Sequence, residues 1–351
     1  MFAKKNVVAA AALLAIAGAA QAQVKVYGTL DAGFGSIETA HAKNSSVRTT
    51  QVTSGTMMTS FIGFSGSEDL GGGLKAEFAL ESFLANDTGE AGGPTTRNKA
   101  GGFWSRGSFV ALTGGFGKVA LGQYDNPLFT SAYTYNPFGS SMVVSPTMRH
   151  LNYVGQLGSD AGTLGAKGAG VGFDTGWVNS VTYESPVVQG FNAVAQYGAK
   201  ESGASNSYAV AGSYNNGPIS ATLTYVKAGV SGTAYTADEK VADLGASYDF
   251  GVVKAFAQFT KITDDTNASA KKDTIYQLGV SVPVSEKVVA MASFGTLKDK
   301  SGSVSTTDRI LTIGADYTLS KRTDVYAAFM NNTQTNLTSG QTFAAGIKHN
   351  F

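Results

Sequence analysis

Few residues in this 351-residue chain are of the types that carry out covalent chemistry, and their spacing does not suit it. The three histidines, His41, His150 and His349, lie far apart, and no two have the spacing of ligands to one metal ion. The chain has no cysteine, which excludes disulfide scaffolds, thiol catalysis and cysteine-bound zinc. The Gly-x-Ser-x-Gly motif that presents a serine nucleophile is also missing from the sequence.

Glu77 and Glu81 could imitate the carboxylate pair of a glycoside hydrolase, because they share one face of a predicted strand. Four residues along a strand separate them by ~13 Å, whereas that chemistry uses carboxyl groups ~5–9.5 Å apart. The glycine clusters at 71–73 and 165–172 lack the Lys-Ser/Thr ending of a phosphate loop, so turns and flexible loops explain them better. We therefore predict no catalytic residue, no cofactor and no metal site, and a protein that is not an enzyme.

The composition is unusual for a soluble enzyme. Charged residues make up 15% of the chain, against ~25% in a typical soluble domain, and the 44 glycines are nearly twice the usual ~7% share. After residue 22, no apolar run approaches the ~20 residues that a membrane-spanning helix needs, which excludes a helical membrane protein. The net charge of +1 leaves no basic excess for binding nucleic-acid phosphates.

The first 22 residues are typical of a secretory signal. Lys4 and Lys5 precede an apolar run at 7–17, and the segment ends in the small-x-small triplet Ala20-Gln21-Ala22. This order predicts cleavage after Ala22, so that residues 1–22 are a signal peptide and residues 23–351 form the exported protein. Cleavage removes two of the 26 basic residues and no acidic one, which leaves a slight acidic excess.

Many segments of the exported chain, residues 23–351, alternate between apolar and polar residues. In one example, Leu244 and Tyr248 share one parity while Asp243 and Ser247 share the other. Two-residue alternation predicts a strand with one apolar and one polar face. A soluble β-sandwich would show the same pattern, because its buried face is apolar.

Three further features favour a barrel in a membrane. Tyr and Phe cap the apolar parity near strand ends, as in the aromatic girdles of transmembrane barrels. Short connections such as 320–323 alternate with long polar ones at 85–102, 228–240 and 264–272. About 16 alternating segments fit the exported chain, at ~20 residues for each strand and its connection. The predicted fold is an all-β, transmembrane antiparallel barrel of about 16 strands, which is wide enough to hold an aqueous channel.

Several segments, in order along essentially the whole chain, resemble the trimeric general porins of Gram-negative bacteria, in particular the β-proteobacterial branch. The similar segments are 23–28 (QVKVYG), 63–78 (GFSGSEDLGGGLKAEF), 109–112 (FVAL), 179–186 (NSVTYESP), 316–323 (DYTLSKRT) and 346–351 (GIKHNF). No single segment decides the matter, but together they are specific.

The resemblance implies a homotrimer of 16-stranded barrels in the cell outer membrane, in contact with its lipid and with lipopolysaccharide. It implies passage of small hydrophilic solutes and ions, and a terminal Phe351 that serves as an assembly signal. It further implies that the third outer loop, between Gly122 and about Trp177, folds inward and narrows the pore. A connection of this length in a compact protein usually has a function.

The sequence departs from the family at the pore wall, where relatives tend to carry arginines opposite this loop. Phe61 and Gln123 stand where the family pattern places arginine, whereas Arg106 fits its position. Few charges and several aromatic residues occupy the loop portion at 125–150. The predicted pore-lining and constriction residues are Phe61, Lys75, Glu77, Glu81, Arg106, Gln123, Asp125, Tyr133, Tyr135 and Arg149.

We therefore predict a passive, water-filled diffusion channel whose charge selectivity is weakened and which favours solutes with an apolar face. A channel that prefers one substrate, with a weak binding track of aromatic loop residues, is the alternative within transport. A barrel that serves as an adhesin or structural anchor is the alternative from another class. The direction of Arg106 stays open, because both parities of the strand that follows it, at 109–112, are apolar.

Overall fold

A computed structural model describes residues 24–43, 48–92, 102–154, 176–199, 206–229, 238–264, 271–301 and 303–351. The predicted signal segment with its cleavage after Ala22, and the glycine cluster at 165–172, lie outside the described residues. Among the described residues, no helix combines the length and apolar character needed to cross a membrane.

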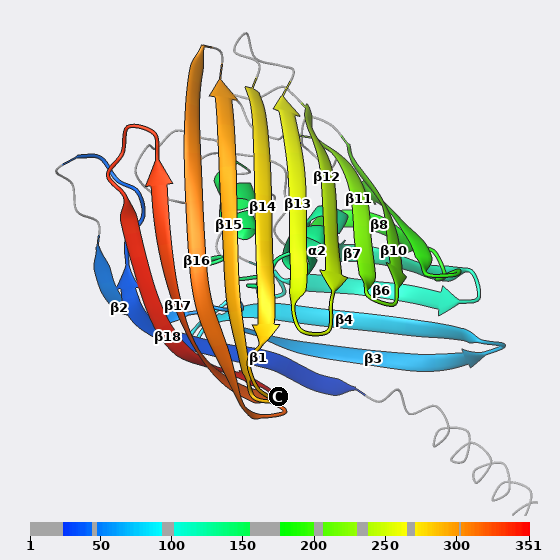
Figure 1. The fold of residues 1–351 in the computed structure, drawn as a ribbon. Coiled ribbons are helices and arrows are strands. Elements are labelled where there is room, and N and C mark those ends of the chain that lie inside the picture. The colour runs from blue at the N-terminus through cyan, green and yellow to red at the C-terminus, as the bar shows by residue number, and fades with distance from the viewer. Residues whose placement is uncertain are drawn as a thin grey trace, which may run out of the picture.

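An antiparallel sheet closes on itself to form a barrel (Figure 1). The first strand, β1 (Lys25–Ile37), pairs with the last, β18 (Gly340–Asn350), and this pairing joins the two ends of the sheet. The strands between them are β2 (Thr49–Ser54), β3 (Phe61–Gly71), β4 (Leu74–Ala85), β5 (Glu90–Ala91), β6 (Gly107–Gly114), β7 (Gly117–Asp125), β8 (Gly176–Glu184), β9 (Phe191–Gly198), β10 (Ser207–Asn216), β11 (Ile219–Gly229), β12 (Asp238–Asp249), β13 (Lys254–Asp264), β14 (Lys271–Pro283), β15 (Val288–Ser301), β16 (Val304–Ser320) and β17 (Thr323–Gln334).

Two strands of the barrel are interrupted. β2 pairs with the second half of β1 and β3 with its first half, so the two segments together fill one place in the sheet. β5 and β6 likewise both pair with β4. The barrel therefore has sixteen strands, which confirms the number predicted from the alternation.

The alternation places successive side chains on opposite faces of the wall. In β14, Leu278 is 65% exposed while its neighbour Gln277 is 1% exposed. β6 follows the same rule, with Val110 exposed on the outer face and Ala111 buried on the inner face. The structure thus settles the parity of the strand that the sequence left open.

The two ends of the barrel carry connections of different length. The turns at 72–73, 217–218 and 321–322 lie at the same end as the C-terminus, where the Asn350 amide donates to the carbonyl of Arg322 (Figure 1). The opposite end carries the longer connections, including residues 126–175 between β7 and β8. In outer-membrane barrels, short turns face the periplasm and longer loops face outward.

Two helices follow β7 and pack against the inner face of the wall. α2 (Pro127–Thr134) contacts β11 and β12, and α3 (Pro146–Val154) contacts β14 and β15. We call residues 126–154 the α2–α3 segment. Its side chains form a hydrophobic core with inward-facing apolar residues of the wall. The core includes Leu128, Phe129, Ala132, Met148 and Leu151 from the helices, and Val226, Val241, Ile262, Ile275 and Leu297 from the strands.

Inward-facing glycines make room for the α2–α3 segment on neighbouring strands. A Cβ atom at Gly245 of β12 would overlap the ring of Tyr135, and one at Gly295 of β15 would press on Pro146. Side chains at these positions would hold the segment away from the wall. Close approach of one backbone to another segment therefore explains part of the high glycine content.

Candidate functional site

The α2–α3 segment begins directly where β7 ends at Asp125. Asn126 is the N-cap of α2, and its side-chain oxygen accepts a hydrogen bond from the Leu128 amide at 2.8 Å. Pro127 follows at the first helical position, where a missing N–H costs nothing. The Asn126 side chain also donates to Gln196 of β9. These contacts turn the chain sharply from the wall into a helix.

A buried carboxylate on the wall holds α2 in place. Asp243 of β12 is 1% exposed and accepts hydrogen bonds from Ser131 of α2 at 2.5 Å and from Thr260 at 2.6 Å. The amide of Gln258 donates to the same carboxylate at 3.1 Å. A buried carboxylate is tolerated only when donors satisfy it, so this network ties the position of α2 to two strands.

Polar contacts also hold α3 and the chain before it. Thr312 of β16 donates to the carbonyl of Val144 at 2.7 Å, and His150 lies 2.9 Å from the carboxylate of Asp308. Arg149 donates to the carbonyl of Val143 at 3.0 Å. Burial lowers the pKa of the Arg149 guanidinium to about 10, which leaves it charged at neutral pH.

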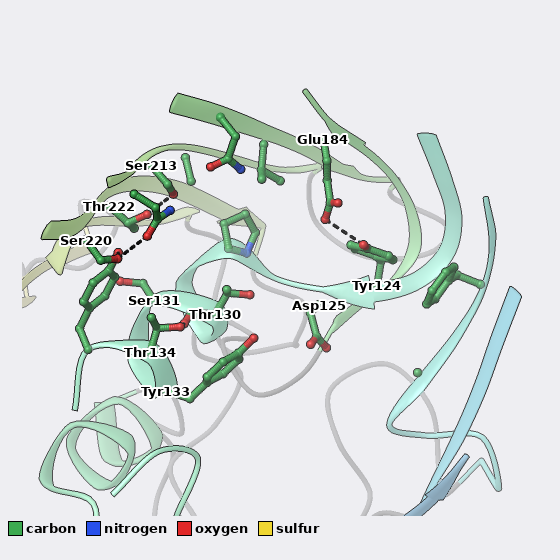
Figure 2. A pocket seen from close by; sticks show the side chains of 18 of the residues that line it. Tyr124, Asp125, Thr130, Ser131, Tyr133, Thr134, Glu184, Ser213, Ser220 and Thr222 are labelled. Carbon is green, nitrogen blue, oxygen red and sulfur yellow. Dashed lines mark hydrogen bonds between the residues drawn. The ribbon is translucent and has the colours of Figure 1, made fainter. Parts of the chain in front are cut away.

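A cavity of about 560 Å³ lies between α2 and the part of the wall that this segment leaves uncovered. The lining comes from β4, β6 to β11 and α2. Figure 2 shows Tyr124 and Glu184 on one side of the cavity and three hydroxyl side chains on the other, with α2 between them. These hydroxyl side chains belong to Ser213, Ser220 and Thr222.

Among the described residues that line this cavity, Arg106 is the only cation. Its guanidinium forms an ion pair with Glu81 and lies over the ring of Phe61, 3.9 Å from the ring centroid. The same carboxylate accepts a hydrogen bond from Tyr27 at 2.6 Å. Arg106 therefore faces the inside of the barrel, and Glu81 balances its charge.

Carboxylates outnumber cations among the described residues of the cavity lining. Asp125 and Glu184 line it together with the Arg106–Glu81 pair, and Glu184 accepts a hydrogen bond from Tyr124 at 2.8 Å. Burial and the nearby Asp125 raise the pKa of the Tyr133 phenol above its ordinary value. This phenol therefore stays neutral at physiological pH.

The structure brings six of the predicted residues together in this lining and places the other four elsewhere. The six are Glu81, Arg106, Gln123, Asp125, Tyr133 and Tyr135.

The other predicted residues lie beside or away from the cavity. Phe61 is 6% exposed and lies beneath Arg106. Glu77 lies 2.9 Å from Lys118 in an ion pair, and Lys75 is an exposed residue on the same strand. Arg149 is buried within the α2–α3 segment.

Phe351 lies next to β1, where it exchanges backbone hydrogen bonds with Gly28.

Sequence reasoning did not predict that the hydroxyl groups of Ser213, Ser220 and Thr222, or the carboxylate of Glu184, line the cavity. The alternation places Ser213, Ser220 and Thr222 on the inner face, which is a usable signal. It does not give the height of each side chain along the barrel, which depends on the register between strands. Glu184 ends β8, and its place in the cavity depends on contact with Tyr124 of the neighbouring strand.

These features define a class of protein. A closed sheet with exposed apolar side chains on its outer face and polar side chains within is the form in which strands cross a bilayer. The wall satisfies its own backbone hydrogen bonds, and the interior holds a polar cavity. The chain is therefore a transmembrane β-barrel.

Comparison with known proteins identifies the family within this class. The family model described as Gram-negative porin matches residues 9–337, and the chain belongs to that family. Outer membrane porin protein 32 of Delftia acidovorans is 34% identical over 344 residues, which cover 94% of this chain and 90% of the relative. The predicted resemblance to β-proteobacterial porins is thus confirmed.

Solved structures agree with this assignment. An anion-selective porin from Comamonas acidovorans is similar with a TM-score of 0.77 at 25% identity, covering 94% of this chain and 100% of that one. The outer-membrane protein OmpT of Vibrio cholerae, folded in vitro and in trimer form, shares the fold with a TM-score of 0.67 at 14% identity. The match covers 94% of this chain and 99% of that one. The chain is an outer-membrane porin channel.

Proposed function

We propose that the chain forms a water-filled channel for passive diffusion of small hydrophilic solutes and ions, with no covalent step. The observation that carries this proposal is the cavity of about 560 Å³ between α2 and the wall of β4 to β11. The α2–α3 segment covers the wall from β11 to β16 through the contacts of Ser131, His150 and Val144. In this proposal, solutes cross the barrel on the uncovered side, and α2 forms one edge of the narrowest part.

The charges in this cavity argue against a strong preference for anions. Glu81 balances the charge of Arg106, and Asp125 and Glu184 add two further carboxylates to the lining. A pore admits ions according to its diameter and the charges that line it. We therefore propose that the channel passes cations at least as readily as anions, unlike the related porin that is described as anion-selective.

The same proposal includes the organisation of the exported protein. Residues 1–22 are removed after Ala22, and residues 23–351 form the barrel. Three copies assemble in the membrane, and Phe351 serves as the assembly signal. The trimer form of a protein with the same fold supports the assembly of three copies.

Conductance across planar lipid bilayers tests the channel. We expect insertion of the purified protein to produce conductance steps that close in groups of three, and a reversal potential in a KCl gradient that is neutral or cation-selective. Absence of conductance would contradict the channel and favour an adhesin or structural anchor. Strong anion selectivity would contradict the charge assignment.

One feature favours a second candidate, a channel with a preference for particular solutes. The rings of Phe109 and Tyr124 pack edge to face, 4.7 Å apart, and both line the cavity opposite the hydroxyl groups of Ser213 and Thr222. An aromatic surface facing hydroxyl groups suits a neutral solute that has one apolar and one polar face. Concentration-dependent block of the ion current by a neutral sugar would support this candidate, and no effect on the current would contradict it.

A further inference from the structure

A second cavity, of about 310 Å³, lies against the wall at the end with the short connections. Residues 215–220, which form the turn between β10 and β11 and the strand ends beside it, make one side of this cavity. The other side consists of Ser247 and Asp249 of β12 and Lys254 of β13. Figure 1 shows the β10–β11 turn beside the β12–β13 turn at this end. We call this space the rim cavity.

The parity of the strands turns the charged residues of the rim cavity inward. Asp249 shares its parity with the buried Asp243, whereas Tyr248 between them is exposed on the outer face. Lys254 shares its parity with Phe256, which is buried on the inner face. Because successive side chains of a strand point to opposite faces, both charges face the inside of the barrel.

The rim cavity adjoins the larger cavity beside α2, because Asn215 and Ser220 line both. Ser220 donates a hydrogen bond to the side-chain oxygen of Asn215 at 2.5 Å, and its hydroxyl lies 3.0 Å from that of Tyr135. A serine hydroxyl has a single proton, so Tyr135 is the donor to Ser220. This chain of hydrogen bonds joins the end of α2 to the wall where the two cavities meet. A solute that leaves the larger cavity along this wall therefore enters the rim cavity.

The register arranges the polar side chains of the rim cavity in two rows. In one row, Asn215 pairs with Ser220 and Ser220 pairs with Ser247, across three neighbouring strands. In the next row toward the rim, Asp249 pairs directly with Lys254. Side chains directly opposite in a sheet have Cβ atoms about 4.5–5.5 Å apart. A row of neutral donors and acceptors therefore lies beside two opposite charges that are close together.

Asp249 and Lys254 do not form an ion pair with each other, and the ion pairs of the described residues include neither of them. The Asp249 carboxylate accepts a hydrogen bond from the Gly251 amide at 2.8 Å. The Lys254 ammonium lies 5.2 Å from the centroid of the Phe256 ring, within the range of cation–π attraction. Phe256 is two residues further toward the middle of the barrel, so this contact draws the ammonium away from the carboxylate. Both charges line the cavity and neither neutralises the other by contact.

We propose that the rim cavity is a binding subsite for a small zwitterion, a solute with one ammonium and one carboxylate group, such as a free amino acid. The ammonium of the solute binds Asp249, its carboxylate binds Lys254, and the Ser247 hydroxyl contacts the groups between them. Charge-assisted hydrogen bonds of both signs favour such a solute. A simple anion would instead be repelled by Asp249, and a simple cation by Lys254.

The size and exposure of the rim cavity suit a solute that binds briefly and moves on. Its volume of about 310 Å³ is at the lower end of the ~300–1,000 Å³ of ligand pockets, which restricts it to small molecules. Asp249 is exposed, so binding is weak enough for release, as conduction requires. This inference rests on the proposed diffusion channel and names one class of solute for it.

Block of the single-channel current by L-glutamine in planar bilayers tests this subsite. The wild type is compared with the D249N/K254Q variant, which removes both charges and leaves the net charge unchanged. We expect the concentration that blocks half of the current to rise roughly tenfold in the variant, since two solvent-exposed charge contacts are lost. The D249K/K254D variant, with the two charges exchanged, should recover much of the block because a zwitterion can bind in the reverse orientation.

D324N/K348Q is the matched control. Asp324 and Lys348 are also paired across neighbouring strands at the same end of the barrel, but they form an ion pair at 3.3 Å. Neither is among the described residues that line the rim cavity. L-glutamine should therefore block this variant as it blocks the wild type, and an equal loss of block in both variants would overturn the subsite.

Two analogues with a single charge test the wild type without any substitution. L-glutamine amide keeps only the ammonium and N-acetyl-L-glutamine keeps only the carboxylate, so both should block less than L-glutamine. Equal block by either analogue would overturn the proposal in favour of simple charge attraction. Saturation-transfer NMR of L-glutamine with the purified protein in detergent measures the same binding without a current. A protein that conducts but does not bind L-glutamine would contradict the subsite alone, whereas absence of conductance would contradict the proposed channel.

Discussion

The guanidinium of Arg106 lies over the ring of Phe61, 3.9 Å from the ring centroid, while the same group forms an ion pair with Glu81. The resemblance to porins predicts a second arginine at the position that Phe61 occupies. In the structure, this ring supports the arginine that remains, since the face of an aromatic ring attracts a cation. The ion pair with Glu81 balances the charge of Arg106 and so reduces the positive charge that passing ions meet.

Removal of the two other carboxylates of the cavity should shift selectivity toward anions. The D125N/E184Q variant leaves the Arg106–Glu81 pair in place and makes the other described residues of the lining neutral. The ratio of cation to anion permeability, obtained from reversal potentials in a KCl gradient, should fall roughly twofold. The change is moderate because each charge acts over a few ångströms in a partly shielded pore. E77Q, which removes a carboxylate paired with Lys118 outside the cavity lining, is the control and should change the ratio less. Equal shifts in both variants would contradict the assignment of Asp125 and Glu184.

Arg106→Gln should have the opposite effect. It removes the cation of the cavity lining and leaves the charge of Glu81 unbalanced, so cation preference should increase. The reversal potential measures this directly. Arg322→Gln removes an exposed cation from a turn at the end with the short connections and serves as the matched control. A wild-type reversal potential in R106Q would show that Arg106 does not face passing ions.

Loss of the hydrogen bond between Ser131 and Asp243 should loosen α2. Ser131→Ala leaves a buried carboxylate with one donor fewer, at a cost of about 1–3 kcal/mol to the packing of the helix. The barrel is formed by pairing between strands and not by α2, so we expect the variant to fold. A loosened α2 should make single-channel currents noisier. Thr134→Ala changes an exposed residue of the same helix and should leave the current noise at the wild-type level. Quiet currents in S131A would mean that other contacts suffice to hold α2.

Substitution of Gly245 should displace the α2–α3 segment from the wall. A Cβ at this position would overlap the ring of Tyr135, so Gly245→Ala forces the chain inward or away from β12. We expect an altered single-channel conductance, measured beside the resistance of the folded barrel to unfolding in detergent. Gly212→Ala on β10 is the control, because a Cβ there meets nothing within 4 Å. Unchanged conductance in a folded G245A protein would contradict a tight fit between segment and wall.

The sequence by itself determined the class of fold. Alternation with an exposed apolar face can be satisfied in a membrane only by a closed sheet, because unpaired backbone groups are too costly in hydrocarbon. The strand number followed from the count of alternating segments, and the resemblance along the chain identified the family. The presence of an aromatic residue, Phe61, where the resemblance predicts an arginine needed no coordinates.

Only the tertiary structure decided which side chains meet inside the barrel. Ser131 and Asp243 are 112 residues apart, and their contact depends on where one helix settles against a distant strand. Ile275 and Leu297 break the polar pattern of the inner face, and the reason becomes visible only when the α2–α3 segment packs on them. Period-two alternation specifies the face of each residue but not its height or its partner. Those depend on register and packing between segments that the chain order keeps apart.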